Sequence, residues 1–136
     1  MSHNVEYEID KDYTYMSNGN LAPQLIVRIS SQNGEPVEFA AVVDTGAEFS
    51  VFKADYLQSL GLNYIDGEKI NVSSACNTFP VYKHKIILSV LDKINFEVIV
   101  GFSDATRRDL LGRDFLDMVQ FGMREHHRQF FLKFEQ

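Results

Sequence analysis

The sequence has too few cysteines for the disulfide bonds that stabilise small secreted domains, and it has no segment suited to crossing a membrane. Its 136 residues include no tryptophan, three prolines and a single cysteine, Cys76. One cysteine cannot form an internal disulfide bond, which favours a reducing compartment. No apolar run approaches the roughly 20 residues of a membrane span, and the first residues lack the pattern of a signal peptide. We therefore expect a soluble, cytoplasmic protein with no membrane partner.

Positive charge is also scarce. Thirteen Lys and Arg residues stand against nineteen Asp and Glu residues, so the formal net charge is −6 at pH 7. An acidic surface repels phosphate backbones and anionic lipids. We therefore expect no nucleic-acid partner.

Apolar residues, by contrast, are plentiful. They make up 45% of the chain, with eleven Phe and six Tyr, which suits a globular, β-rich domain large enough to bury its own core. We expect one folded domain over residues 22–136, preceded by a strand or arm over residues 1–21. Residues 4–16 alternate loosely, as an edge strand or an ordered arm does.

Short apolar segments separated by turn residues run along the rest of the chain. Asn33-Gly34 and Asp92-Lys93 each lie between two such segments and predict hairpins. Helical spacing is expected over 50–60, ended by Gly61, and again over 113–118. Many short strands with regular turns predict an all-β, closed or nearly closed barrel. The predicted strands cover 25–30, 37–43, 68–74, 81–91, 95–101, 110–111, 119–123 and 129–134.

One segment carries the strongest functional signal. Residues 39–52 read Phe-Ala-Ala-Val-Val-Asp-Thr-Gly-Ala-Glu-Phe-Ser-Val-Phe, so an apolar run delivers Asp44 directly onto a tight turn. A carboxylate at the end of a buried strand is costly unless it is paired, hydrogen-bonded or functional. Gly46 allows a close backbone approach, and Thr45 adds a hydroxyl at the same place. This grouping is what an aspartic peptidase needs from each half of its active site.

A second segment near the C-terminus strengthens the interpretation. It reads Asp109-Leu-Leu-Gly-Arg-Asp-Phe-Leu116. Taken together, Ala-Val-Val-Asp-Thr-Gly-Ala and Leu-Leu-Gly-Arg-Asp-Phe-Leu closely resemble the retropepsin family, the retroviral-type aspartic proteases and their cellular and bacterial relatives. The resemblance covers roughly residues 22–134 in order and spacing. It implies a closed β-barrel with one short C-terminal helix and a flap, a hairpin that folds over the substrate.

The resemblance also implies roles for the residues of the Asp-Thr-Gly turn. Asp44 is expected to be the catalytic carboxylate. Thr45 is expected to hydrogen-bond across a two-fold axis to a second chain. Gly46 and Ala47 are expected to line the cleft and offer backbone groups to an extended peptide, and Glu48 stands where the family usually places an acid.

Structural support beneath this turn is expected from Gly112, Arg113 and Asp114. The family's buried arginine corresponds to Arg113, which we expect to form a bidentate pair with Glu48. The alternative is that Arg113 pairs with its neighbour Asp114 on the surface of the helix.

The flap is where the chain departs from the family. Retroviral members use several glycines at the tip, whereas residues 73–81 contain none. Asn77 can adopt a left-handed conformation, and Phe79 could provide an apolar lid. The residues expected to form the flap are Ala75, Cys76, Asn77, Thr78 and Phe79.

The chemistry implied by the resemblance requires two carboxylates that share one proton, one acting as base and the other as acid. This chain has one Asp-Thr-Gly, so the second carboxylate is expected from a second copy across a two-fold interface. The predicted function is a homodimeric aspartic endopeptidase that acts on peptides or proteins. The alternatives are a catalytically silent, dimeric peptide-binding module, and a protease too selective to cut generic peptides.

Other chemistries fit the sequence poorly. His126 and His127 are adjacent and would face opposite sides of a strand, so they are not a metal pair. His84 and Cys76 have no spacing that supports a zinc site, and no neighbouring histidine supports Cys76 as a nucleophile. We expect no metal and no cofactor.

Overall fold

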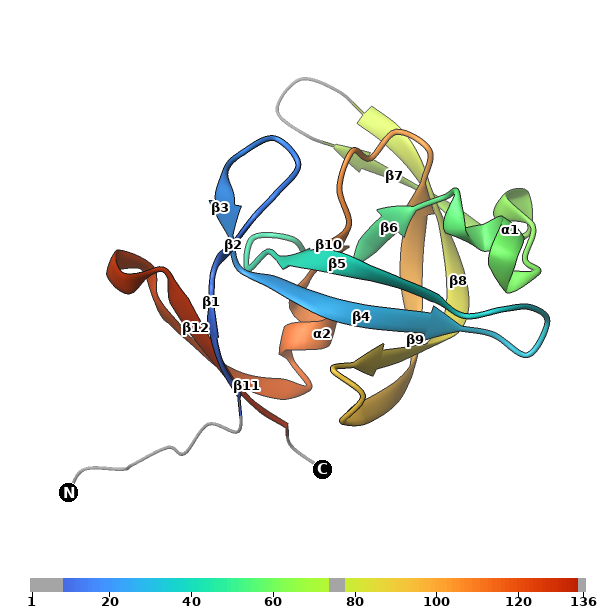
Figure 1. Ribbon diagram of the computed structural model, residues 1–136. Helices are drawn as coiled ribbons and strands as arrows, with labels where there is room; N and C mark the ends of the chain where they lie inside the picture. The colour runs from blue at the N-terminus through green and yellow to red at the C-terminus, as the bar shows by residue number, and fades with distance from the viewer. Residues whose placement is uncertain (1–8, 74–77, 135–136) are drawn as a thin grey trace.

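A six-stranded barrel forms the centre of the molecule (Figure 1). The computed structural model describes residues 9–73 and 78–134. Successive barrel strands are hydrogen-bonded neighbours, and the last of them pairs back with the first, which confirms the predicted closed all-β barrel. In order around the barrel the strands are β4 (Gln24–Ser30), β5 (Val37–Val43), β10 (Leu110–Leu111), β6 (Val51–Lys53), β9 (Ile94–Ser103) and β8 (Thr78–Val90).

The short strand β10 joins the two parts of the sequence that carry the motifs. It runs parallel to β5, with Leu110 opposite Val42 and Leu111 opposite Val43. On its other side it pairs antiparallel with β6. The end of β5, where Asp44 follows, is therefore fixed against residues almost 70 positions later in the chain.

The predicted flap hairpin is present. Strand β7 (Glu68–Ser73) pairs antiparallel with the first part of β8, from Glu68 opposite Lys83 to Ser73 opposite Thr78. The two strands rise beyond the barrel at the top of Figure 1. The predicted flap residues Ala75, Cys76 and Asn77 lie outside the described residues.

A second, three-stranded sheet brings the two ends of the described chain together. Its order is β1 (Ile9–Asp12), β12 (Gln129–Phe134), β11 (Val119–Arg124), all antiparallel. A small hairpin of β2 (Thr14–Tyr15) and β3 (Leu21–Ala22) links β1 to the barrel. Figure 1 shows this hairpin projecting to the same side of the molecule as the flap hairpin.

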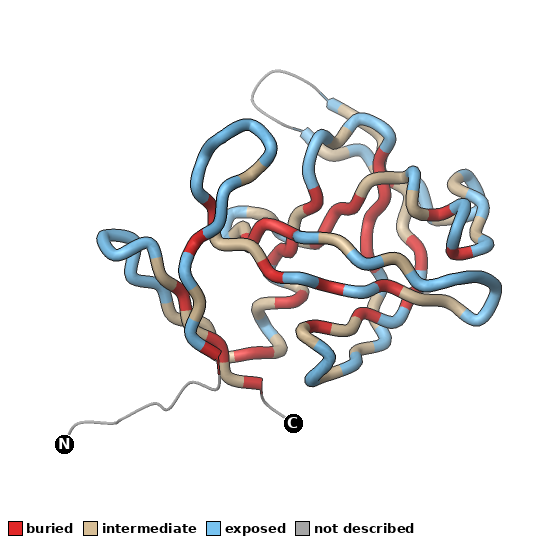
Figure 2. Tube along the Cα trace, viewed as in Figure 1, coloured by how far each residue is buried: buried red, intermediate tan, exposed pale blue. Residues whose placement is uncertain are grey.

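The hydrophobic core fills the barrel and continues under the terminal sheet (Figure 2). Phe52, Phe102, Phe115 and Phe130 are among its fully buried side chains. Ile9 belongs to the same cluster, so the described part of the N-terminal arm packs on the core that the barrel strands share.

The helical segments are shorter than the sequence suggested. The prediction of helical spacing over 50–60 is wrong for its first part, because Val51 to Lys53 form β6 and pair with β9. Only Tyr56–Leu60 is helical (α1), and it ends at Gly61 in the left-handed conformation, as predicted. The C-terminal helix α2 covers Arg113–Leu116. Two 3-10 turns, Tyr64–Asp66 and Glu125–His127, complete the helical elements, and no helix among the described residues is long and apolar enough to cross a membrane.

The hairpin around Asn33-Gly34 forms for a different reason from the one expected. Strands β4 and β5 do pair across it, with Ile29 opposite Val37. Gly34, however, is not among the glycines with positive φ. A Cβ on Gly34 would lie 2.2 Å from the Ser59 carbonyl oxygen, so glycine is needed there for close packing of the hairpin against α1.

Candidate active site

Asp44 follows the last residue of β5 and is held by backbone hydrogen bonds from neighbouring segments. Its N–H donates to the Leu111 carbonyl at 2.9 Å, and the Val42 N–H donates to the Asp109 carbonyl at 2.8 Å. From the other side, the Val43 N–H donates to the Pro23 carbonyl at 2.7 Å. The backbone that carries the Asp44 carboxylate is thus held by hydrogen bonds from both neighbouring segments.

The turn itself is closed by the Asp44 side chain. The Gly46 N–H donates to Asp44 Oδ1 at 2.9 Å, and the Ala47 N–H donates to the Asp44 carbonyl at 3.2 Å. Among the described residues no group donates to the other carboxylate oxygen, Oδ2. Asp44 is half-buried, whereas Thr45 and Gly46 are exposed. One oxygen therefore orients the side chain, and the other has no donor within the described chain.

Beneath the turn lies a compact network around Ser50 and Asp114. The Ser50 N–H donates to Asp114 Oδ2 at 2.9 Å and its hydroxyl donates to Oδ1 at 2.7 Å. The Gly112 N–H donates in turn to the Ser50 hydroxyl at 3.0 Å, and the Phe115 N–H donates to Asp114 Oδ1. Ser50 is only 1% exposed. These bonds clamp the segment after the Asp-Thr-Gly turn onto the start of α2.

Gly112 permits this clamp by its lack of a side chain. A Cβ there would lie 2.7 Å from the Phe49 carbonyl oxygen and 2.9 Å from that of Ala47. The Arg113 N–H also donates to the Ala47 carbonyl at 2.8 Å. A larger residue at position 112 would push the two segments apart, since both nearest contacts are backbone atoms.

The expected ion pair of Arg113 is not formed. Arg113 and Glu48 are both exposed, and no salt bridge within the described ranges joins Arg113 to Glu48 or to Asp114. The Asp114 carboxylate is instead occupied by the Ser50 donors. The support beneath the turn therefore comes from Asp114 and from the Arg113 backbone, and both predicted pairings of the Arg113 side chain are wrong in this chain.

This arrangement predicts a contrast between neighbouring substitutions. Asp114→Ala should lower the free energy of unfolding by about 3 kcal/mol, because the Ser50 N–H and hydroxyl lose their acceptors in a buried place. Arg113→Ala should change it by no more than about 0.5 kcal/mol, because the side chain is exposed and the backbone bond stays. Urea unfolding of the two variants and the wild type measures both. Equal losses in the two variants would contradict the network.

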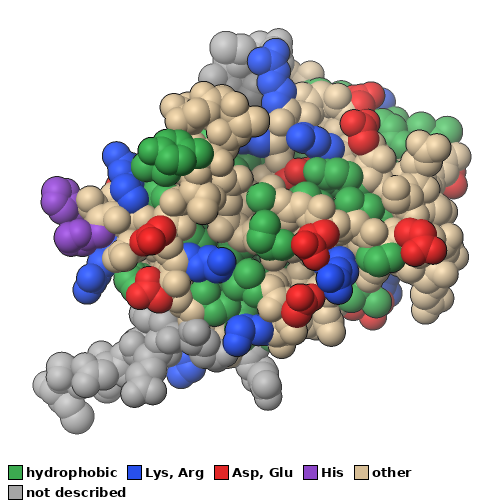
Figure 3. Space-filling view, in the orientation of Figure 1, with side chains coloured by type: hydrophobic (Ala, Val, Ile, Leu, Met, Phe, Trp, Pro, Cys, Tyr) green, Lys and Arg blue, Asp and Glu red, His purple; other side chains and the backbone are tan. Residues whose placement is uncertain are grey.

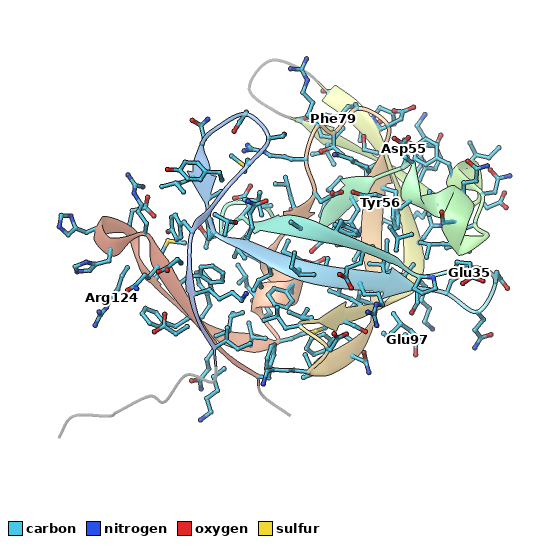
Figure 4. The ribbon with its side chains drawn as sticks, in the orientation of Figure 1. Glu35, Asp55, Tyr56, Phe79, Glu97 and Arg124 are labelled. Atoms are coloured by element: carbon cyan, nitrogen blue, oxygen red, sulfur yellow. The ribbon has the colours of Figure 1, made fainter. Side chains whose placement is uncertain are left out.

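Phe49 connects the turn to the strand that carries the flap. The Lys83 ammonium lies 4.9 Å from the centre of the Phe49 ring. Lys83 belongs to β8, which continues to Phe79 in the flap hairpin (Figure 4). Phe79 is half-buried and lies opposite Val72, whereas Thr78 is exposed. The segment that follows the Asp44 turn thus contacts the strand that continues into the flap hairpin.

Comparison with known proteins identifies the family. The family model described as aspartyl protease matches residues 26–115, which is more than half of the chain and includes the Asp-Thr-Gly motif and all of the second motif except Leu116. The chain belongs to the aspartyl protease family. It is accordingly a hydrolase that cleaves peptide bonds. No curated protein matches the sequence.

Solved structures show the same fold. The structure of EIAV protease complexed with the inhibitor HBY-793 matches this aspartyl protease with a TM-score of 0.53 and 21% sequence identity. The match covers 83% of this chain and 92% of that chain. It confirms the retropepsin-like fold that the two motifs predicted.

Two buried polar residues in the segments that hold the Asp44 turn were not predicted from the sequence. Ser50 was the one hydroxyl inside Glu-Phe-Ser-Val-Phe, and a polar residue within such an apolar run signals a buried hydrogen bond. Asp109 precedes the Leu-Leu-Gly-Arg-Asp-Phe-Leu motif and is only 5% exposed. The Tyr56 hydroxyl donates to Asp109 Oδ2 at 2.6 Å and the Lys53 N–H donates to Oδ1 at 2.9 Å.

The buried Asp109 predicts a pH dependence of stability. Burial raises the pKa of Asp109 above its ordinary 3.8, although the bonds from Tyr56 and Lys53 and the Lys53 charge pull it back. The Asp109 carboxyl group therefore binds its proton more tightly in the folded protein than in the unfolded chain. The resulting gain in the free energy of unfolding is present below about pH 4 and is lost as the pH rises through the pKa of Asp109 in the folded state.

Asp109→Asn removes this titration. The stability of the wild type relative to Asp109→Asn should therefore fall from pH 4 upwards, until Asp109 is fully ionised. Urea unfolding of both proteins across this range gives the difference. Asp66→Asn, at an exposed aspartate, controls for the general loss of a negative charge. A difference that grows in favour of the wild type as the pH rises would contradict the prediction.

The histidines play structural or surface roles in the described chain. His84 is buried, and its Nε2 lies 3.0 Å from the Tyr64 carbonyl oxygen. His126 and His127 are exposed in the 3-10 turn Glu125–His127 (Figure 3). Over residues 9–73 and 78–134 no three His, Cys, Asp or Glu side chains gather as a possible metal site.

Proposed function

We propose that the protein is a homodimeric aspartic endopeptidase in which a water molecule is activated between two Asp44 carboxylates, one from each chain. The observation that supports this proposal most strongly is the geometry of the Asp-Thr-Gly turn. It is rigid below, through Ser50 and Asp114, and exposed above, at Thr45 and Gly46. A single chain offers one such carboxylate, and the chemistry needs two.

The proposed reaction starts with one proton shared by the pair. The ionised Asp44 removes a proton from the bound water, whose oxygen forms a bond to the peptide carbonyl carbon. The protonated Asp44 of the other chain donates a hydrogen bond to the carbonyl oxygen as negative charge develops there. The C–N bond then breaks, and a proton passes from the carboxyl pair to the leaving amine.

The surrounding residues are assigned supporting roles. Thr45, being exposed at the open side of the turn, reaches across the two-fold axis to its counterpart. The backbone groups of Gly46 and Ala47 bind an extended peptide. Glu48 follows them in the chain and is exposed. The β7–β8 hairpin covers the peptide, with Phe79 as the apolar contact of its described part.

The pH profile tests this mechanism. Cleavage of a diverse peptide library should be fastest at acidic pH and should decline as the pair loses its last proton. A statine-type transition-state mimic should inhibit that cleavage. A rate that keeps rising into alkaline pH, insensitive to the mimic, would overturn the shared-proton mechanism. Tight binding of the mimic with no cleavage at any pH would favour the silent peptide-binding module instead.

A further inference from the structure

A cavity of about 730 Å³ lies beside the proposed active site and is separate from the Asp44 turn. Its walls are the β2–β3 hairpin, the outer side of β5 and the loop over residues 104–109. In Figure 1 the hairpin and this loop flank the end of β5. The whole cavity belongs to a single chain and needs no partner to be complete.

The side chains in this cavity carry an excess of positive charge. Lys53, Arg107 and Arg108 line it, against a single carboxylate, Asp109. Both oxygens of Asp109 already accept hydrogen bonds, and none of the three cations forms a salt bridge within the described chain. In a chain of net charge −6, three cations around a hollow that holds one carboxylate suit an anionic ligand.

The cavity lies on the same face of β5 as the side chain of Asp44. Ala40 and Val42 line the cavity, and residues two apart along a strand point to the same side. Ala41 and Val43 belong to the core cluster, which places Ala40, Val42 and the following Asp44 on the outer side. Two residues of strand span about 7 Å. A peptide lying over Asp44 therefore needs to extend by only one or two side chains to enter the cavity.

The β2–β3 hairpin is held in place as a wall of the cavity. The Gln24 amide donates to the Thr14 hydroxyl at 2.9 Å, and the Arg108 guanidinium lies 3.9 Å from the Met16 sulfur. Tyr15, which also lines the cavity, is 73% exposed. The hairpin thus places the aromatic ring of Tyr15 in the same cavity as the three cations. An acidic side chain can use both, because its methylene groups contact the ring and its carboxylate contacts the cations.

We propose that this cavity is a specificity subsite that binds an acidic side chain, Glu or Asp, of the peptide substrate. Arg107, Arg108 and Lys53 are the residues assigned to the carboxylate. The inference rests on the proposed function, because the peptide is brought to the cavity by its binding over Asp44. In a symmetric dimer a second, identical cavity lies on the other side of the catalytic pair, so acidic residues on both sides of the scissile bond strengthen binding further.

Binding to the full-length Asp44→Asn protein tests the subsite without requiring cleavage. The probes are fluorescein-labelled peptide pools of about ten residues, with Glu or Gln at one fixed position and mixed residues elsewhere. Glu and Gln have the same shape, so only the charge differs. At the position that reaches the cavity, the Glu pool should bind about tenfold more tightly than the Gln pool in fluorescence anisotropy, and added salt should reduce the preference.

Substitutions in the cavity identify its residues. Arg107→Gln and Arg108→Gln, made in the Asp44→Asn protein, should each reduce the preference for Glu several-fold, and the double substitution should abolish it. Both side chains are exposed, so the fold should not be affected. Lys93→Gln removes the same charge at an exposed site in the turn between β8 and β9 and should leave the preference unchanged.

Three outcomes would overturn the proposal. They are equal binding of the Glu and Gln pools at every position, a preference that survives the Arg107→Gln, Arg108→Gln double substitution, and complete competition by free glutamate or inorganic phosphate at concentrations similar to those of the peptide. The last would mark the cavity as a site for a free anion. A charge preference in binding without any cleavage by the wild type would leave the subsite standing and refute the protease mechanism instead.

Discussion

Asp44→Asn is expected to reduce peptide cleavage by about 10³-fold or more while leaving the protein folded. The variant keeps the shape of the side chain, and its amide oxygen can still accept the hydrogen bond from the Gly46 N–H. It cannot take a proton from water or share one with a second carboxylate. Single-turnover cleavage of a peptide selected from the library measures the loss, and circular dichroism during heating monitors the fold.

Asp92→Asn is the matched control for this experiment. It makes the same chemical change at an exposed position in the turn between β8 and β9, where Asp92 has a positive φ that asparagine tolerates well. Its cleavage rate should equal that of the wild type. If Asp44→Asn retained wild-type activity, Asp44 would be excluded as the catalytic carboxylate.

Specific activity is expected to disappear on dilution below the dissociation constant of the dimer. A lone Asp44 cannot hold the attacking water and donate a hydrogen bond to the peptide carbonyl at the same time. Light scattering over a concentration series gives the fraction of dimer, and cleavage measured on the same samples should follow that fraction. A monomer that cleaves peptides at an undiminished specific rate would refute both the dimer and the shared-proton pair.

Mixing active and inactive chains provides a sharper form of this test. With a tenfold excess of Asp44→Asn and free exchange of subunits, a wild-type chain meets another wild-type chain in roughly one of eleven pairings, so activity should fall to about a tenth. The same excess of Asp92→Asn should raise the total activity in proportion to the added chains. Unchanged activity in the first mixture would show that each chain works alone.

The structure narrows the surfaces that such a dimer can use. From the sequence, either residues 5–15 or residues 129–134 could add an edge-to-edge strand pair between chains. Strand β12 is the middle strand of the terminal sheet, with β1 and β11 on its two sides, so it is not an edge. Among the described strands of this sheet, β1 and β11 lie at the edges, so in the proposed dimer we expect backbone pairing with a second chain to use one of them.

Local chemistry explains why so much of the fold and the active-site motif could be predicted from the sequence. The short apolar segments separated by turn residues, the positive φ at Gly61 and the apolar run into Asp44 each depend on neighbours in the chain. The two motifs together were specific enough to indicate the family. By itself, the sequence thus determined the barrel, the flap hairpin and the candidate catalytic carboxylate.

The tertiary structure decided which side chains support that carboxylate. Ser50 and Asp114 are 64 residues apart, and their pairing depends on β10 running beside β5 and β6. For the same reason the sequence could not show that Arg113 is exposed. The cationic cavity gathers Lys53, Arg107 and Arg108 from two separate segments and closes them with the β2–β3 hairpin. These arrangements arise from contacts between segments distant in the chain, and no local pattern of residues encodes them.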